Sequence, residues 1–417
     1  MNPVLPRAHF VPDGEAHVMP DGRLYVYGSY DLSGNMSYCS DVLHVFSTDN
    51  LKDWVDHGVS FSIKDIPWAG DDSILYAPDC IHKDGKYYLY FCLSDNTEGV
   101  AVSDSPYGPF KDPEIIEHAS GDGIDPAIFL DDDQTPYYFW GQFSLRAAEM
   151  NRDMKTLKAE TIIGNLLDEK RHGFHEGASV RKYKDNHILL YTCILRGKAT
   201  CLAHATSKHP LGPYTYRGIV IDNIGVDPST WNNHGSIERF NGDWYVFYHR
   251  SSQNSVFNRR LCIERIDIAD DGFIKEVVPT TQGTESPIPA LTVIDASSAC
   301  RLGGWGTNAY IAPDSDRMQE EVIQNASGNG WAIFRYIDFS EEIHSFSLEY
   351  ASSGSGTVEI WADDLKISEL TLTETNGIYM ISSESAYNIS GVHTLYLQWR
   401  LQNGIMKIKG LRFNGSL

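Results

Sequence analysis

The chain has 417 residues and contains 34 Lys and Arg against 56 Asp and Glu, which gives a formal net charge of −22 at pH 7. This negative charge repels phosphate backbones and anionic lipids, so nucleic acid and membrane surfaces are not expected partners. Hydrophobic residues make up 42% and aromatic residues 12%, which is enough apolar surface for a packed core and excludes disorder.

The N-terminal segment 1–7 lacks the positively charged and apolar regions of a secretory signal. The seven cysteines form an odd set with no Cys-x-x-Cys pair, and several lie inside strand-like segments. Such cysteines are typical of reduced core thiols, so we expect a cytoplasmic protein.

One phrase, a turn pair followed by an aromatic-rich strand, recurs five times along the first two thirds of the chain. It occupies residues 21–27, 84–90, 133–140, 185–191 and 241–248. Asp-Gly and Asn-Gly are strong signals for a tight β-hairpin, because the turn needs positive φ angles. Each phrase therefore predicts the bend of one hairpin.

A spacing of about fifty residues per unit is typical of propeller blades. Residues 1–287 are therefore predicted to form a five-bladed β-propeller, the catalytic domain of an all-β protein. Unrelated hairpins in a β-sandwich are the alternative interpretation. Beyond residue 286 the phrase disappears and short alternating strands such as 357–361 follow, which predicts a β-sandwich of the jelly-roll type over residues 288–417.

The first strand of each propeller blade lines the central axis, so polar residues just before the five bends should meet there. Each unit supplies one such residue: Asp13, Asp79, Asp125, Glu176 and His234. Carboxylates crowded in a partly dry cavity acquire different pKa values, so that one can serve as an acid and another as a base. This is the chemistry that glycoside hydrolysis requires. The alternative explanation for the presence of any single acid at these positions is that it caps a hairpin or turn, where Asp is favoured.

Five further residues are candidates for binding the sugar. Trp68, Trp140, Phe174 and Trp231 could stack on sugar faces, and Arg250 could donate hydrogen bonds to hydroxyl groups.

Over residues 5–285 the sequence resembles glycoside hydrolase family 43. The resemblance rests on Ala77-Pro78-Asp79, on Gly123-Ile124-Asp125-Pro126, on Phe174-His175-Glu176-Gly177 and on the stretch from Asn233 to Arg250. It implies a five-bladed propeller in which Asp13 is the general base, Glu176 is the general acid, and Asp125 raises the pKa of that acid and orients it. It also implies inversion at the anomeric carbon.

Two positions leave alternatives open. The family commonly has Asp-Pro at the base, whereas Gly14 and Glu15 follow Asp13 here, so Glu15 is a rival; strand alternation favours Asp13. His234 resembles the axial histidine of the family, which implies one structural calcium ion near His234 that the chemistry does not require. A buried histidine that bonds to carbonyls or water is the other interpretation.

The C-terminal region resembles family-6 carbohydrate-binding modules at 331–339 and 391–397. The binding aromatic residue and late asparagine of that family have no clear match, since 379–381 and 407–409 read Tyr-Met-Ile and Lys-Ile-Lys. We therefore expect this domain to serve a packing role.

Together these features predict an exo-acting, inverting glycosidase that releases terminal α-L-arabinofuranose from small arabinoxylan-type oligosaccharides. β-Xylosidase activity on xylo-oligosaccharides is the first alternative. A catalytically inactive propeller that only binds sugar, or one that binds proteins, belongs to a different class. The sequence does not predict an oligomeric state.

Overall fold

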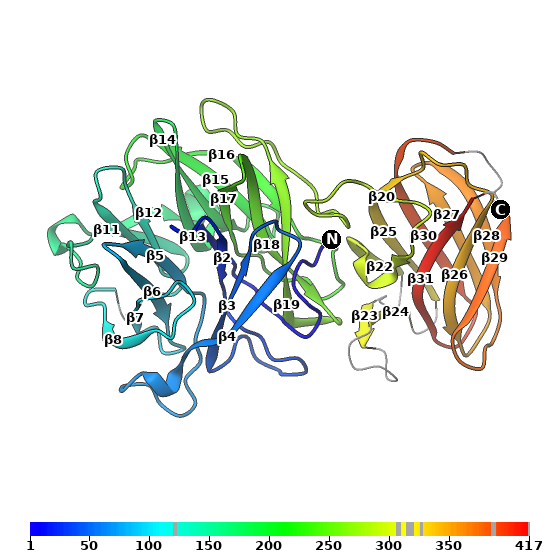
Figure 1. The fold of residues 1–417 in the computed structure, drawn as a ribbon, viewed down its shortest axis with the longest axis horizontal. Helices are drawn as coiled ribbons and strands as arrows, with labels where there is room; N and C mark the ends of the chain where they lie inside the picture. Colours follow the sequence, from blue (N-terminus) through cyan, green and yellow to red (C-terminus); the bar gives the residue numbers. More distant parts are fainter. Residues whose placement is uncertain (120–122, 306–309, 314–320, 326–327, 385–388, 416–417) are drawn as a thin grey trace.

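The computed structural model describes residues 1–119, 123–305, 310–313, 321–325, 328–384 and 389–415. Almost all regular structure in these ranges is β-strand, and the single α-helix, α1 (Glu169–His172), is one short turn (Figure 1). The all-β prediction is confirmed. Within the same ranges, no helix has the length and apolar character needed to cross a bilayer.

The chain up to residue 266 forms five separate antiparallel sheets, each made of consecutive strands. The first contains β1 (Glu15–Val18), β2 (Leu24–Tyr27), β3 (Val42–Thr48) and β4 (Trp54–Ser62). The second contains β5 (Asp79–Lys83), β6 (Lys86–Cys92), β7 (Glu98–Ser103) and β8 (Lys111–Ile115). The third contains β9 (Ala127–Leu130), β10 (Pro136–Trp140), β11 (Ser144–Glu149) and β12 (Ile163–Asp168). The fourth contains β13 (Phe174–Tyr183), β14 (Asn186–Cys193), β15 (Cys201–Ser207) and β16 (Thr215–Asp222). The fifth contains β17 (Ser236–Phe240), β18 (Asp243–Ser252) and β19 (Ser255–Ile266).

Each predicted hairpin bend joins the first strand of a sheet to the second, so the five bends are confirmed. The bends contain residues with positive φ, such as Gly85 at 78° and Gly242 at 95°. A hydrogen atom in place of a side chain makes this conformation accessible to glycine at no steric cost.

The first strands of the five sheets contact one another in a cyclic order, β1 to β5, β9, β13, β17 and back to β1. Five hydrophobic clusters fill the spaces between neighbouring sheets in the same order. Adjacent residues of one strand enter different clusters: Tyr90 packs toward the third sheet and Phe91 toward the first. This cyclic packing is what a five-bladed propeller requires.

The two ends of the ring meet at β1 and β17. Gly14 and Gly235 form a parallel bridge, and the Ser236 hydroxyl donates to the Gly14 carbonyl oxygen (2.9 Å). The amide of Val4 donates to the carbonyl oxygen of Leu261 on β19 (3.1 Å). Residues from the start of the chain thus complete the packing of the last sheet.

The C-terminal region forms two six-stranded sheets. The first contains β20 (Ile288–Pro289), β22 (Arg301–Trp305), β25 (Gly328–Asp338), β27 (Gly356–Ala362), β28 (Leu365–Leu372) and β30 (Val392–Leu401). The second contains β21 (Ile294–Asp295), β23 (Tyr310–Pro313), β24 (Glu321–Asn325), β26 (Ser345–Ser352), β29 (Tyr379–Glu384) and β31 (Met406–Asn414). Side chains from both sheets share one hydrophobic cluster, which includes Phe334, Leu397 and Trp399 of the first sheet and Leu348 and Phe413 of the second.

Buried polar contacts connect the C-terminal sheets to the ring. Arg250 donates to the Ala299 carbonyl oxygen (2.8 Å), and Leu302 donates through its amide to Gly225 (2.9 Å). Arg260, which also lies over the Phe10 ring, donates to Glu321 Oε1 (2.6 Å). Burial lowers the pKa of Arg260 to about 10, while the Glu321 carboxylate opposes this shift.

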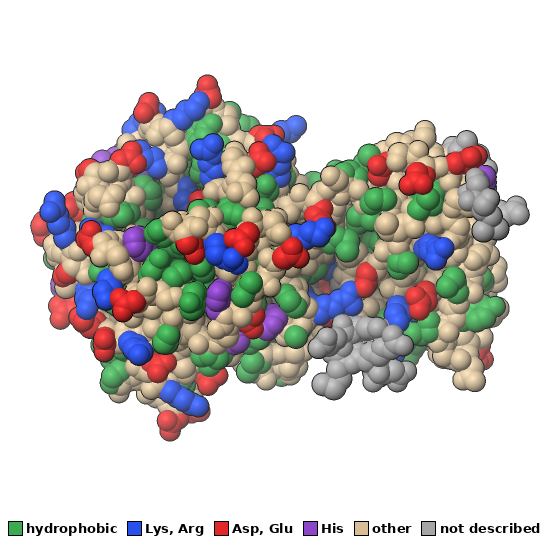
Figure 2. Space-filling view, in the orientation of Figure 1, with side chains coloured by type: hydrophobic (Ala, Val, Ile, Leu, Met, Phe, Trp, Pro, Cys, Tyr) green, Lys and Arg blue, Asp and Glu red, His purple; other side chains and the backbone are tan. Residues whose placement is uncertain are grey.

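Basic and acidic side chains are interspersed on the face shown in Figure 2.

The Arg260–Glu321 pair gives a prediction for stability. Glu321→Ala should lower the free energy of unfolding by about 3–5 kcal/mol, because it leaves the buried guanidinium without its counter-charge. Denaturant unfolding measures this change. Asp243→Ala removes an exposed pair with Arg265 (2.7 Å) and should cost less than about 1 kcal/mol. Equal losses for the two variants would contradict the prediction.

Candidate active site

Four of the predicted site residues, Asp13, Asp125, Glu176 and His234, line one hollow of about 390 Å³. A hollow of this size accommodates a small ligand. Asp13 and Asp125 precede the first and third sheets, and Glu176 lies in the fourth, so the structure brings together residues that lie far apart in the sequence. The axial pattern predicted this arrangement for these four residues and also for Asp79, which does not line the hollow.

Local backbone geometry sets the direction of the three acidic side chains. Asp13 and Asp125 lie just before β1 and β9 and have positive φ angles of 58° and 59°. A left-handed residue costs free energy unless its surroundings hold it, and aspartate tolerates this conformation better than most residues. Glu176 lies at a register shift in β13, followed by Gly177 with a φ of 67°. Such a bulge redirects a side chain out of the regular alternation.

Asp13 is held by cationic and polar partners from the last sheet. Arg259 Nη1 donates to Asp13 Oδ1 (3.1 Å), and the Asp13 amide donates to Nδ1 of His249 (3.4 Å). Arg259 is itself fixed by Asp31, whose two carboxylate oxygens accept from its Nε and Nη2 (both 2.9 Å). Burial opposes ionisation of Asp13, yet Arg259, His249 and His234 together hold its pKa well below the usual range.

Asp125 has the opposite electrostatic environment. Burial, together with the negative charges of Glu176 and Asp13, raises the pKa of Asp125 well above its usual range. Nδ1 of His234 lies 3.8 Å from Asp13 Oδ1 and 3.7 Å from Asp125 Oδ2, so this ring is close to both acids. The Gln142 amide donates to Glu176 Oε2 (2.8 Å), which fixes the orientation of that carboxyl group.

Glu15, the rival for the role of Asp13, is not among the described residues that line the hollow. It accepts hydrogen bonds from Arg181 and Ser179 (both 2.8 Å). Burial raises the pKa of Glu15 to about 7. Asp79 is also buried outside the hollow, where its Oδ1 lies 2.7 Å from His17 Nε2. Of Asp13 and Glu15, the two candidates for the general base, Asp13 is therefore the one that lines the hollow.

The calcium expected near His234 can be tested against the donor groups around that ring. Calcium takes six to eight oxygen ligands. Among the described residues, groups of three ligand atoms close enough to share an ion occur at Glu15, His17 and Asp79 and at His9, His44 and Asp56, and neither group contains His234. The described side chains at His234 therefore do not fit an ion held directly by the protein, and water would have to supply most of its shell.

Of the five predicted sugar-binding residues, the structure brings only Trp231, which is 56% exposed, to this hollow. Trp140 and Phe174 are buried in the clusters between sheets, and Trp68 packs against the cluster of the first and second sheets. Arg250 is buried and contacts Ala299. Sequence reasoning placed these residues near the axis, but strand alternation turns the Trp140, Phe174 and Arg250 side chains toward neighbouring sheets or the C-terminal region. Trp68 lies in a turn between β4 and β5.

Other residues, which the axial pattern did not select, line the hollow instead. They include Tyr38, Tyr76, Gln142 and Arg259. Arg259 lies on β19, the third strand of its sheet, and Tyr38 lies in a loop, so a search limited to first strands cannot find them. The two adjacent arginines at 259 and 260, in an acidic chain, were the available sequence signal for Arg259.

Comparison with known proteins identifies relatives of both parts of the chain. The family model described as glycosyl hydrolases family 43 matches residues 1–274. A xylosidase/arabinosidase of Thermoclostridium stercorarium is 29% identical over 96% of each chain. An arabinoxylan arabinofuranohydrolase of Paenibacillus polymyxa is 24% identical over 93% of this chain and 69% of its own. A solved family 43 β-xylosidase/α-arabinofuranosidase from a compost metagenome, in a calcium-free complex with xylotriose, is 34% identical and has a TM-score of 0.58, covering 67% of this chain and 97% of its own.

Proposed function

Because the chain belongs to glycosyl hydrolase family 43, it hydrolyses O-glycosyl bonds, and we propose that it is an exo-acting, inverting enzyme that releases terminal α-L-arabinofuranose from arabinoxylan-type oligosaccharides. The names of its relatives support xylosidase/arabinosidase activity without distinguishing between the two. The observation that carries the proposal is the convergence of Asp13, Asp125 and Glu176 on one sugar-sized hollow.

In the proposed mechanism, Asp13 is the general base. Arg259 keeps it ionised, so it can take a proton from the water that attacks the anomeric carbon. Glu176 is the general acid that protonates the departing oxygen, and Gln142 orients it. Asp125, which lines the same hollow, is the third carboxyl group of the site and positions the acid. Inversion requires a water molecule between base and sugar, with the two carboxyl groups about 6.5–9.5 Å apart.

Two observations support removal of a terminal arabinose. A hollow of about 390 Å³ suits a small sugar unit at the end of a chain or in a side group, and Trp231, which lines the hollow and is 56% exposed, offers a surface for the next sugar ring. The Paenibacillus relative, which matches this chain beyond the ring, is named an arabinoxylan arabinofuranohydrolase. The name of the xylotriose-bound relative favours β-xylosidase activity as the second candidate.

The rest of the sequence interpretation forms part of the proposal. The cyclic sheets support a five-bladed propeller over residues 1–287, and the two sheets with a shared core support a β-sandwich over 288–417. The calcium ion near His234 stays a prediction. All seven cysteines are unpaired and buried, which agrees with the proposed cytoplasmic location.

Hydrolysis of the nitrophenyl derivatives of α-L-arabinofuranose and β-D-xylopyranose tests the activity. We expect a higher kcat/KM with the arabinofuranoside. Preference for the xyloside would establish the second candidate, and no turnover of either compound, or of arabinoxylan oligosaccharides, would favour a propeller that only binds sugar.

The roles of the two carboxyl groups can be separated by the leaving group. Glu176→Gln should lower kcat by about 10²- to 10⁴-fold on oligosaccharides but much less on nitrophenyl glycosides, because nitrophenolate departs without a proton. Asp13→Asn should lower both rates to a similar extent, since both substrates need an activated water. Equal sensitivity of Glu176→Gln to the two substrates would contradict its assignment as the acid.

The Arg259–Asp13 contact predicts a change in pH dependence. A base must be ionised, so activity falls as the pH drops through its pKa. Removing the cation in Arg259→Met raises the pKa of Asp13, so the acid limb of kcat/KM should move to higher pH. Arg259→Lys should move it less. Arg265→Met, on the exposed part of β19, is the control and should not move it. Identical acid limbs in Arg259→Met and the parent enzyme would contradict the role of Arg259.

A further inference from the structure

Two histidines and one aspartate form a group on the outer strands of the first sheet. His9 comes from the N-terminal segment, His44 from β3 and Asp56 from β4. His44 Nδ1 lies 3.1 Å from Asp56 Oδ1, and His9 Nε2 lies 3.6 Å from Asp56 Oδ2. None of the three is among the described residues that line the candidate active site. Their side chains are 18%, 14% and 29% exposed, in the order His9, His44 and Asp56, so ions in solution can reach the group.

The strand register and a bulge bring the three side chains together. Asp56 pairs with Phe46 across β3 and β4, and His44 lies two positions before Phe46, so alternation places all of them on one face. Gly58, with a φ of 75°, lies at the register shift of β4, and its amide donates to Asp56 Oδ1 (2.8 Å). The His9 ring packs edge-on against Phe46, with ring centroids 5.1 Å apart. These contacts hold the N-terminal segment over the same face.

Tyr30 fixes both imidazole rings. Its hydroxyl oxygen lies 3.0 Å from Nδ1 of His9, and its ring stacks on His44 with centroids 4.2 Å apart and an angle of 10° between the planes. When the Tyr30 hydroxyl accepts the hydrogen of Nδ1, the lone pair of His9 is on Nε2, the nitrogen nearer to Asp56. Histidines that bind metals are commonly oriented in this way, by an acceptor on the other ring nitrogen. Tyr30 therefore arranges the donor atoms before any ion binds.

The other group of three close ligand atoms, at Glu15, His17 and Asp79, has a different charge environment. Arg181 donates to Glu15 (2.8 Å) and brings a permanent positive charge to that group. Asp79 accepts from two backbone amides (2.6 and 2.7 Å). Oxygens that already accept from an arginine and from amides are poor ligands for a cation. Asp56 instead faces two imidazole rings, which carry no permanent charge.

We propose that His9, His44 and Asp56 bind one divalent transition-metal ion, such as Zn²⁺, with water as the fourth ligand. Zinc accepts imidazole nitrogen and carboxylate oxygen, and the ligand atoms of a tetrahedral zinc site lie about 3.3 Å apart. The distances of 3.1 and 3.6 Å within the group are close to this value. Calcium and magnesium take oxygen ligands, so this site differs from the one expected near His234.

The position of this metal site links it to the closure of the ring. Phe10, next to His9, and Asp31, next to Tyr30, form an antiparallel bridge. Asp31 in turn accepts from Arg259 on β19 (2.9 Å). An ion at His9 therefore joins the N-terminal segment to β3 and β4 beside its contact with the fifth sheet. Because an ion held by three parts of the folded chain binds the unfolded chain weakly, it stabilises the fold.

Titration of the metal-free full chain with Zn²⁺, in competition with a chromophoric chelator, tests the proposal. The parent chain should contain one saturable site that Ca²⁺ does not occupy. Tyr30→Phe keeps the ring that stacks on His44 and removes only the hydroxyl group, and it should raise the Kd of this site by about 10- to 100-fold. His44→Ala and Asp56→Asn each remove a ligand and should raise the Kd at least as much.

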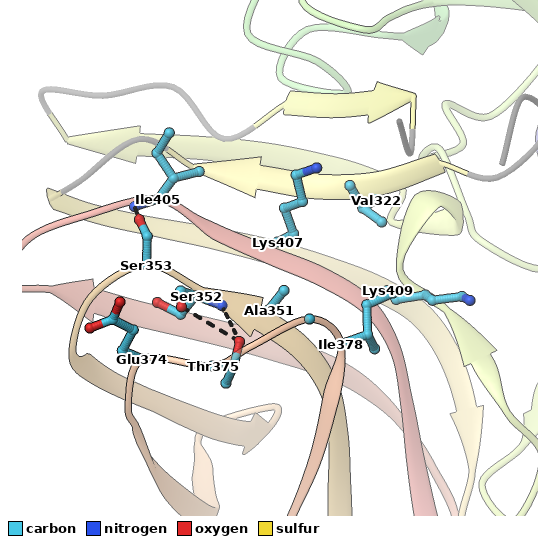
Figure 3. Close-up of a pocket in the computed structure, with 11 residues that line it drawn as sticks. Val322, Ala351, Ser352, Ser353, Glu374, Thr375, Ile378, Ile405, Lys407 and Lys409 are labelled. Carbon is cyan, nitrogen blue, oxygen red and sulfur yellow. Dashed lines mark hydrogen bonds between the residues drawn. The ribbon is translucent and has the colours of Figure 1, made fainter. Parts of the chain in front are cut away.

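Two control variants remove a histidine or an acid that lies outside the group. His57 follows Asp56 on β4, but its ring stacks on Tyr107, with centroids 4.3 Å apart. Glu374 lines a hollow of the second C-terminal sheet, and two lysines line the same hollow (Figure 3). His57→Ala and Glu374→Gln should therefore leave the Kd for Zn²⁺ unchanged.

Thermal unfolding gives a second readout that does not depend on the chelator. Zn²⁺ at about 100 times its Kd should raise the Tm of the parent chain by about 2–5 °C and should not raise the Tm of Asp56→Asn. Unfolding in EDTA shows which variants are folded; if His44→Ala is not, Asp56→Asn and Tyr30→Phe decide. A parent chain without a saturable site, a Kd that the folded ligand variants leave unchanged, or an equal rise in His57→Ala would overturn the proposal. No glycoside is used, so these results do not depend on the proposed function.

Discussion

Burial of the inner strands, such as β6, on both of their faces is the constraint on which the ring depends. Every sheet between residues 15 and 266 packs against two neighbours, so residues that alternate along an inner strand must be apolar on both sides, as Tyr90 and Phe91 are. No single sheet can bury the apolar side chains on both of its faces without its neighbours. The sheets are therefore stable as a set, and the set brings the first strands, with the segments that precede them, to one axis.

The same packing gives two aspartates opposite properties. Asp13 and Asp125 have nearly equal backbone geometry and similar burial. Arg259 stands beside Asp13, whereas Asp125 faces Glu176 and Asp13 itself. The pKa values move apart because of the charges that the neighbouring sheets supply. The position of each aspartate in the repeat thus determines where its side chain lies. The charges of the neighbouring sheets determine its pKa.

The sequence predicted the five bends and the meeting of Asp13, Asp125, Glu176 and His234, because these depend on local turn chemistry and a repeating offset. It did not predict the partners of the acids. Arg259, Gln142 and Tyr38 come from later strands or loops, where no periodic signal marks them. The candidates Trp140 and Phe174 failed because proximity along the chain does not determine which face of a strand a side chain occupies.

The contact between β1 and β17 also has a consequence for biosynthesis. Asp13 depends on Arg259, which is 246 positions later, and on His249, which is 236 positions later. On the ribosome, the N-terminal sheet must wait for the fifth sheet to emerge before its acid acquires these neighbours. A nascent chain shorter than that lacks the partners of Asp13 in the proposed catalytic centre, so we expect activity to begin only after the fifth sheet has packed against the chain's own beginning.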